Sequence, residues 1–158
     1  MSGLKHNFST KAVSKLVVRV YGICIHEDQW VLLADEQIGN FQVTKFPGGG
    51  LMTGEGIADC LRREWLEETG TAVKSFTHLY TTDFFVQSAF DPSAQVICVY
   101  YIVTFEGHLT AIRSDVPRFS GRDGKTLRWH PLPHLKPPLF HFKTDQVACS
   151  IFLQKFRE

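Results

Sequence analysis

Residues 48–70 read GGGLMTGEGIADCLRREWLEETG and combine a glycine-rich turn with a helix that carries three acidic side chains. Glu64, Glu67 and Glu68 occupy positions i, i+3 and i+4, so their side chains share one face of one helical turn. Carboxylates at this spacing repel one another by about 0.2–0.5 kcal/mol per pair on an exposed helix. A bound divalent cation would remove this repulsion. Because all three groups are oxygen donors, they suit Mg²⁺ or Mn²⁺ better than zinc.

The helix is expected from about Ile57 to Thr69, with Gly70 as its C-terminal stop. Projection at about 100° per residue separates an apolar stripe from the acids. The stripe consists of Ile57, Ala58, Leu61 and Trp65. The acids are centred about 80° from this stripe, which places them on the flank where the helix meets a sheet. A cleft is expected along that flank.

The rest of the chain alternates between strand and helix patterns. Strands are predicted over 16–25, 30–34, 40–46, 72–85, 95–105 and 126–130, and a second helix over 143–156. Residues 95–105 are apolar on both faces, which indicates a central position in a sheet. The sum is an α/β (α+β) sandwich with a mixed sheet inside and helices outside. We expect a single domain over residues 1–158, with 1–14 as a polar lead-in.

Composition narrows the classes of partner. The net charge of +1 gives no global basic field, so binding to nucleic acid or an anionic membrane is not indicated. No apolar run reaches the roughly 18–20 residues that span a bilayer, and the N-terminus has no run of signal-peptide type. A cytoplasmic location is therefore expected. The cysteines are widely spaced and are expected to be buried free thiols: Cys24, Cys60, Cys98 and Cys149.

The acidic helix and its glycine turn match a known signature. Gly49, five residues, Glu55, seven residues and then REWLEETG from Arg63 to Gly70 resemble the Nudix box, G-x5-E-x7-R-E-U-x-E-E-x-G-U, where U is a bulky apolar residue. Every charged and glycine position is met. Trp65 fills the first U, where aliphatic residues are commoner, and Thr71 departs from the last U.

This resemblance implies an α/β/α sandwich and a hydrolase that cleaves a nucleoside diphosphate linked to another moiety, using Mg²⁺ or Mn²⁺. It also implies roles for residues of the box. Glu64, Glu67 and Glu68 would bind the metal, with the carbonyl of Gly48 as a further ligand. Either Glu64 or Glu67 would take the proton of the attacking water. The base lies outside the box in some members of the family, and Asp115, Asp123 and Glu106 are the candidates here.

Arg63 has more than one possible partner by spacing alone. It can pair with Glu67 or Asp59 along the helix, or reach back to Glu55 near the helix start. We favour Glu55, because that residue belongs to a loop that needs fixing. The resemblance likewise gives Gly49, Glu55, Arg63 and Gly70 a structural role in the box.

The substrate pocket is less clearly indicated. Phe84 and Phe85, with Phe90 nearby, can stack on a nucleobase, although packing within the core or a loop is the favoured explanation. Basic residues recur over 113–128 and can meet phosphates or form a solvated loop: Arg113, Arg118, Arg122, Lys125 and Arg128. His130, His134 and His141 are too irregularly spaced to predict a zinc site.

Other functions remain open at this stage. A nucleotide-sensing, non-catalytic module with the same fold is the main alternative, although such modules usually lose box glutamates. An isomerase of allylic diphosphates and a calcium-binding domain fit less well, the latter because calcium needs 6–8 oxygens from a flexible loop. The expected partner is a nucleotide-type small molecule, and the resemblance also implies a homodimer.

Overall fold

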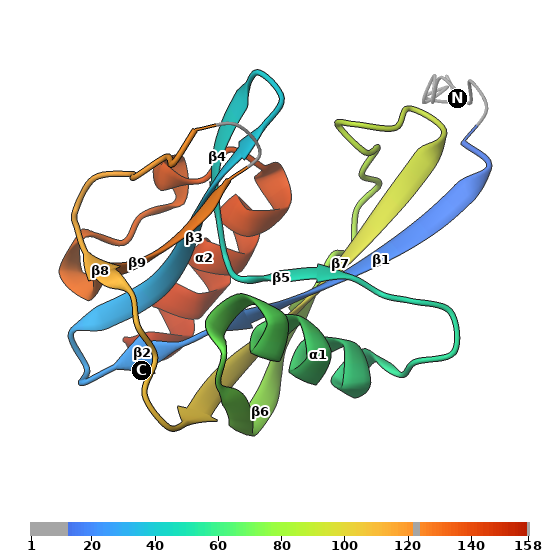
Figure 1. The fold of residues 1–158 in the computed structure, drawn as a ribbon. Coiled ribbons are helices and arrows are strands. Elements are labelled where there is room, and N and C mark those ends of the chain that lie inside the picture. The colour runs from blue at the N-terminus through green and yellow to red at the C-terminus, as the bar shows by residue number, and fades with distance from the viewer. Residues whose placement is uncertain (1–12, 122–123, 158) are drawn as a thin grey trace, which may run out of the picture.

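The computed structural model describes residues 13–121 and 124–157 (Figure 1). Its strands are β1 (Lys15–Ile23), β2 (Ile25–His26), β3 (Trp30–Ile38), β4 (Phe41–Lys45), β5 (Gly48–Gly50), β6 (Ala72–Thr81), β7 (Ala94–Glu106), β8 (Ile112–Arg113) and β9 (Lys125–Pro131). Its helices are α1 (Ile57–Thr69) and α2 (Lys143–Phe156), and two 3₁₀ turns cover Leu132–His134 and Pro137–Leu139.

The strands form two mixed sheets. One has the order β5-β1-β7-β6, and the other has the order β2-β3-β9-β8 with β4 paired to β3. In the first sheet β1 and β7 are parallel, whereas β5 and β6 pair antiparallel with them. The interior position expected for the strand at 95–105 is therefore confirmed by β7.

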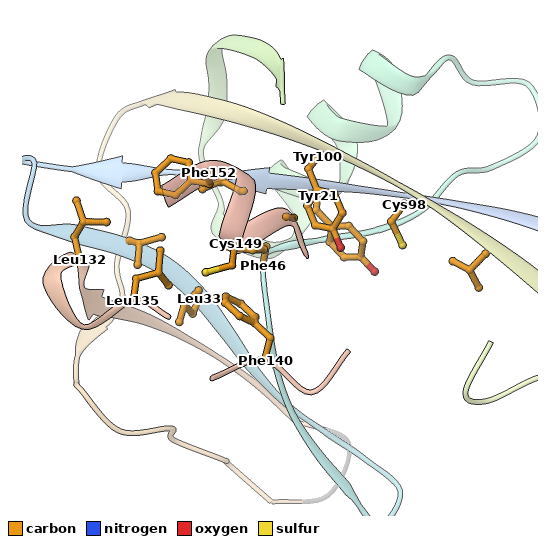
Figure 2. Packing of buried hydrophobic residues seen from close by; sticks show 14 residues of the cluster. Tyr21, Leu33, Phe46, Cys98, Tyr100, Leu132, Leu135, Phe140, Cys149 and Phe152 are labelled. Atoms are coloured by element: carbon orange, nitrogen blue, oxygen red, sulfur yellow. The ribbon is translucent and has the colours of Figure 1, made fainter. Parts of the chain in front are cut away.

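Two hydrophobic cores lie on opposite faces of these sheets. Successive residues of a strand point to opposite faces, so Val20 and Leu32 enter one core while Tyr21 and Leu33 enter the other. Helix α1 covers the first core with Trp65 and its neighbours. Helix α2 covers the second, where Figure 2 shows Phe152 and Cys149 packed between the two sheets. The expected class, helices packed outside mixed sheets, is confirmed, with the strands divided between two sheets.

Helix α1 has the predicted bounds. It follows Gly56, whose amide donates to the Asp59 carboxylate at 2.9 Å. It ends at Gly70, which adopts φ 70° and donates its amide to the carbonyl of Leu66 at 2.9 Å. The predicted stripe is wrong at Ile57, which is exposed, because the helix becomes buried only from Cys60 onward.

Some predicted boundaries move. The strand predicted over 72–85 ends at Thr81, and the strand predicted over 30–34 continues to Ile38 because it pairs with both β4 and β9. Most of the polar lead-in predicted at 1–14 lies outside the described residues. The two-residue strand β8 lies outside every predicted strand.

The four cysteines are free and buried. Burial raises the pKa of Cys24 and Cys149 to about 12, so these thiols stay protonated. Among the described residues no helix has the length and apolar character needed to cross a membrane.

Candidate active site

The glycines of β5 allow an unusually close approach between strand and helix. Gly48 and Gly49 pair with Tyr21 and Val20 of β1. A Cβ at Gly48 would overlap the carbonyl of Val20, and a Cβ at Gly49 would overlap the carboxyl group of Glu64. The missing side chains therefore make room for an acidic side chain of α1 directly against the strand.

Glu68 is the most enclosed of the three acids, with a side chain only 6% exposed. The amide of Gly48 donates to its Oε2 at 3.0 Å, and the ammonium of Lys125 binds its Oε1. Burial raises the pKa of Glu68, whereas the charges of Lys125 and Lys45 oppose that rise. Both carboxylate oxygens are thus held by donors from other parts of the fold.

Arg63 joins the glycine turn to the helix. Its guanidinium donates to both oxygens of Glu55, at 3.0 and 2.6 Å, and to the carbonyl of Gly50 at 2.9 Å. It also donates to Glu64 at 2.9 Å, while its contact with Glu67 is longer, at 3.4 Å. The hydrogen bonds from Arg63 hold the pKa of Glu55 at about 2. Of the partners that spacing allowed, the structure places Glu55 in the bidentate contact.

We call Glu64, Glu67 and Glu68 the acidic flank, and its members are unequal. The Glu64 side chain is 15% exposed, whereas that of Glu67 is 58% exposed. Within 13–121 and 124–157, no three His, Cys, Asp or Glu side chains converge as a metal site would require. One oxygen of Glu64 binds Arg63, and one oxygen of Glu68 binds Lys125.

A cavity of about 730 Å³ is lined by Arg19, Glu36 and Lys45. Among the described residues the three acids do not line it, but Lys125, which binds Glu68, lies 3.9 Å from Glu36. The β3–β4 hairpin and the segment before β7, which both extend to one end of the molecule in Figure 1, contribute to its lining. Phe84, Phe85 and Phe90 line it together with Phe142, and we call these four residues the aromatic wall. The aromatic residues predicted for substrate binding are therefore brought to one cavity.

Two basic side chains connect the cavity to the acids. Lys45 binds Glu36 at 2.9 Å and also exerts its charge on Glu68. Arg19 donates to the hydroxyl of Tyr21 at 2.6 Å. The pKa of Arg19 is raised, mainly by Tyr21 and to a smaller extent by Glu64. Lys45 and Arg19, which line the cavity, therefore interact electrostatically with Glu68 and Glu64, respectively.

The sequence analysis missed Arg19 and Lys45, although a signal was present. Arg19 interrupts the apolar strand LVVRVYGICI, where a charge is unexpected unless it has a partner or a role. It also missed Phe41, whose ring contacts that of Phe90, a residue of the cavity lining, at a centroid distance of 6.0 Å. Nothing in the spacing of Phe41 and Phe90 indicates that they meet.

Most of the basic residues predicted over 113–128 lie elsewhere. Arg128 is buried and binds Asp35 through two nitrogens at 2.7 and 3.0 Å, so its assignment as a phosphate contact is wrong. Arg113 packs over the ring of Trp30 at 4.8 Å. Lys125 does reach the acidic flank.

Of the candidate bases outside the box, Asp115 and Glu106 make no contact with the acids among the described residues. Asp115 binds His134 at 3.0 Å, just beyond the end of β9. Lys125, at the start of β9, is the residue that reaches Glu68, and a strand of this length spans about 20 Å. Glu106 is exposed and opposite Ala72 at the end of β7. Asp123 and Arg122 lie outside the described residues.

His130, His134 and His141 do not form a zinc site in the described part of the chain. His130 is buried and its Nδ1 accepts from Arg128 at 2.8 Å, while burial lowers its pKa. His141 lies instead among the residues that line the cavity.

The two departures from the expected signature contact each other. The indole Nε1 of Trp65 donates to the hydroxyl of Thr71 at 3.1 Å, and both side chains are buried. A Cβ at Gly22 would lie 3.0 Å from the Trp65 ring, so glycine there leaves room for the large side chain. Thr71 therefore provides the hydrogen-bond acceptor that the buried indole N–H of Trp65 requires.

Comparison with known families and structures gives a consistent result. A family model described as NUDIX domain matches residues 15–149. No curated protein sequence matches the chain.

Several solved structures share the fold at low sequence identity. A structure of MutT, from a study of the protein in Aliivibrio salmonicida and Vibrio cholerae, has a TM-score of 0.63 and 22% identity, with 89% of this chain and 99% of that chain covered. A NUDIX hydrolase from Nitrosomonas europaea has a TM-score of 0.67 and 17% identity, with 89% and 90% covered. A structure described as an ADP compounds hydrolase has a TM-score of 0.63 and 17% identity, with 89% and 73% covered.

Proposed function

The chain belongs to the NUDIX family, and we propose that it is a Mg²⁺- or Mn²⁺-dependent hydrolase of the diphosphate bond in a nucleotide linked to another group. Nucleotide sugars, ADP-ribose and similar nucleotides are the proposed substrates. The observation that carries the proposal is that Lys125 binds Glu68 and lies 3.9 Å from Glu36, which lines the cavity of about 730 Å³. A volume of this size is in the range of ligand pockets, about 300–1,000 Å³.

The donor set suits a hard divalent cation. Glu64 and Glu68 offer carboxylate oxygens, and Gly49 leaves the space into which the Glu64 carboxyl group projects. We propose that these two acids hold the ion, with Glu67 and the carbonyl of Gly48 as further ligands. The bound ion would neutralise phosphate charge and lower the pKa of a coordinated water.

The side chains of the cavity have separate roles in this proposal. Lys45 and Arg19, between the cavity and the acids, bind the diphosphate. Phe84 and Phe85 stack on the base or on another planar part of the substrate. Water attacks phosphorus, the bond to the bridging oxygen breaks, and Glu64 or Glu67 accepts the proton of the water.

Incubation with Mg²⁺ and a substrate panel tests the activity. The panel contains ADP-ribose, nucleotide sugars, dinucleoside polyphosphates and nucleoside triphosphates, and chromatography detects the nucleoside monophosphate product. The ADP compounds hydrolase among the similar structures supports including ADP-containing compounds. Release of a monophosphate only in the presence of the metal is the expected result.

Glu68→Gln separates catalysis from folding. This variant keeps the size of the side chain and its contact with the Gly48 amide but removes the charge. We expect turnover to fall by at least about a hundredfold with the circular dichroism spectrum unchanged. Loss of folding in this variant would instead give Glu68 a structural role.

A nucleotide-sensing module without catalysis is the second candidate. The observation in its favour is that the described acids do not converge on one point, while Arg63 binds Glu64 and Lys125 binds Glu68. Tight nucleotide binding with no product at any Mg²⁺ or Mn²⁺ concentration would support this candidate over hydrolysis.

A further inference from the structure

Lys125 places a positive charge next to Glu68, the most enclosed acid of the acidic flank. The Glu68 side chain is almost fully enclosed, and the Lys125 ammonium binds one of its two oxygens. The other oxygen accepts from the Gly48 amide at 3.0 Å. A buried carboxylate is strongly destabilising without a compensating charge. The ammonium of Lys125 offsets the negative charge of Glu68.

The geometry also gives Lys125 an alternative partner. Its side chain is 31% exposed, and its ammonium lies 3.9 Å from Glu36, whose carboxylate is already held by Lys45 at 2.9 Å. Lys125 is therefore within reach of a second acid on the cavity side and of solvent. It can leave Glu68 without becoming a buried unpaired charge.

We propose that Lys125 is a displaceable internal cation that competes with the divalent metal ion for Glu68. This inference rests on the proposed function, since it assumes that Glu68 is a metal ligand. An ammonium in hydrogen-bond contact with Glu68 and a metal ion on the same carboxylate repel each other, so one must leave. Lys125 thereby stabilises the metal-free state and weakens metal binding; it is a positioning residue rather than a catalytic one.

Mn²⁺ titration of the full chain, followed by electron paramagnetic resonance, tests the competition. Lys125→Met keeps an unbranched side chain, one atom shorter, and removes the charge. We expect its Mn²⁺ dissociation constant to fall by about fivefold relative to the wild type. Lys125→Arg should retain the wild-type value because the charge remains. Lys15→Met is the matched control, since Lys15 forms an exposed ion pair with Asp91, 3.2 Å apart, and should leave the constant unchanged.

Thermal unfolding gives an independent readout. Lys125→Met should melt at a lower temperature than the wild type without metal, and the difference should shrink at saturating Mn²⁺, because the ion then compensates Glu68. A merely structural lysine would lower the melting temperature equally with and without Mn²⁺. Lys125→Gln provides a second neutral variant if Lys125→Met does not fold.

The outcomes separate this inference from the proposed function. If the wild type binds Mn²⁺ and neither neutral variant binds it more tightly, the competition is wrong while the hydrolase proposal stands. If the wild type takes up no Mn²⁺ with or without ADP-ribose, both are wrong. Tighter binding in the neutral variants together with wild-type binding in Lys125→Arg supports the competition.

Discussion

The acidic flank and the aromatic wall are constructed in different ways. The acidic flank belongs to one continuous segment, residues 48–70, in which Arg63 links the glycine turn to the helix. The aromatic wall is assembled from residues far apart in the chain, Phe84 to Phe90 and Phe142, and Phe41 of β4 contacts the ring of Phe90. The first side can be recognised from a local pattern of residues, whereas the second exists only after the chain has folded.

This difference has a functional consequence. In the acidic flank, Arg63 holds Glu64 at 2.9 Å and the Gly48 amide holds Glu68 at 3.0 Å. In the proposed function the aromatic wall binds the variable part of the substrate, and its Phe85 and Phe90 side chains are about half exposed. Substitutions on the two sides should therefore affect different kinetic parameters.

The largest effect is expected on the acidic side. Glu64→Gln removes the charge of an acid that Arg63 and Gly49 hold in place, and kcat should fall by about 10²–10³-fold without a change in melting temperature. Glu67→Gln should have a smaller effect, because the Glu67 side chain is 58% exposed. Steady-state kinetics measure both, with the exposed Glu27→Gln as control. Equal losses at Glu64 and Glu67 would contradict the ranking drawn from exposure.

The next effect is a loss of stability in the sheet that brings Glu36 and Lys45 to the cavity. Asp35→Ala leaves Arg128 as a buried charge without its partner, which should lower the free energy of unfolding by about 3–5 kcal/mol. Urea denaturation measures the change. Replacing both residues, as Asp35→Leu with Arg128→Met, should recover much of the stability. A single variant as stable as the wild type would show that the ion pair is dispensable.

A smaller effect is expected on the aromatic side. Phe85→Ala and Phe90→Ala remove stacking surface from the cavity, and KM should rise by roughly 5- to 100-fold while kcat changes little. Phe156→Ala, at the exposed end of α2, is the control for loss of a phenyl ring. If kcat fell as much as in Glu64→Gln, the proposed division of roles between the two sides would not hold.

The smallest effect is a pH dependence of stability behind the cavity. Asp145 is buried and accepts from the Tyr100 hydroxyl at 2.8 Å, and burial raises its pKa from 3.8 to about 7. The native state therefore binds this proton more tightly than the unfolded state, so Asp145 makes stability fall as pH rises from about 4 to 7. Calorimetry should show a steeper loss of melting temperature between pH 5 and pH 8 in the wild type than in Asp145→Asn. Parallel pH profiles would contradict this assignment.

Much of the fold could be predicted from local patterns. The bounds of both helices were correct, because apolar periodicity and Gly70 act within a few residues of each other. Strand ends were less accurate, as with Ile38, because pairing with distant strands decides where a strand stops. The burial of Arg128 could not be predicted, since its partner Asp35 is 93 residues away.

The departures from the signature illustrate the same limit within the site. Trp65 and Thr71 are each atypical when considered alone, and only the structure shows that one donates a hydrogen bond to the other. Gly22 also accommodates Trp65, because the Trp65 ring lies against the backbone of Gly22 and leaves little room for a side chain there. The local sequence shows that Trp65 and Thr71 are atypical, whereas their hydrogen bond in the folded protein explains why they occur together.

The sequence by itself determined the family, the acidic helix and its glycine turn, because those features depend on spacings within 23 consecutive residues. The tertiary structure alone decided which acid is enclosed, which lysine compensates it and which aromatic residues meet around the cavity. Burial, ion pairing and ring contacts join residues that are distant along the chain, and their energies depend on the surroundings that folding creates.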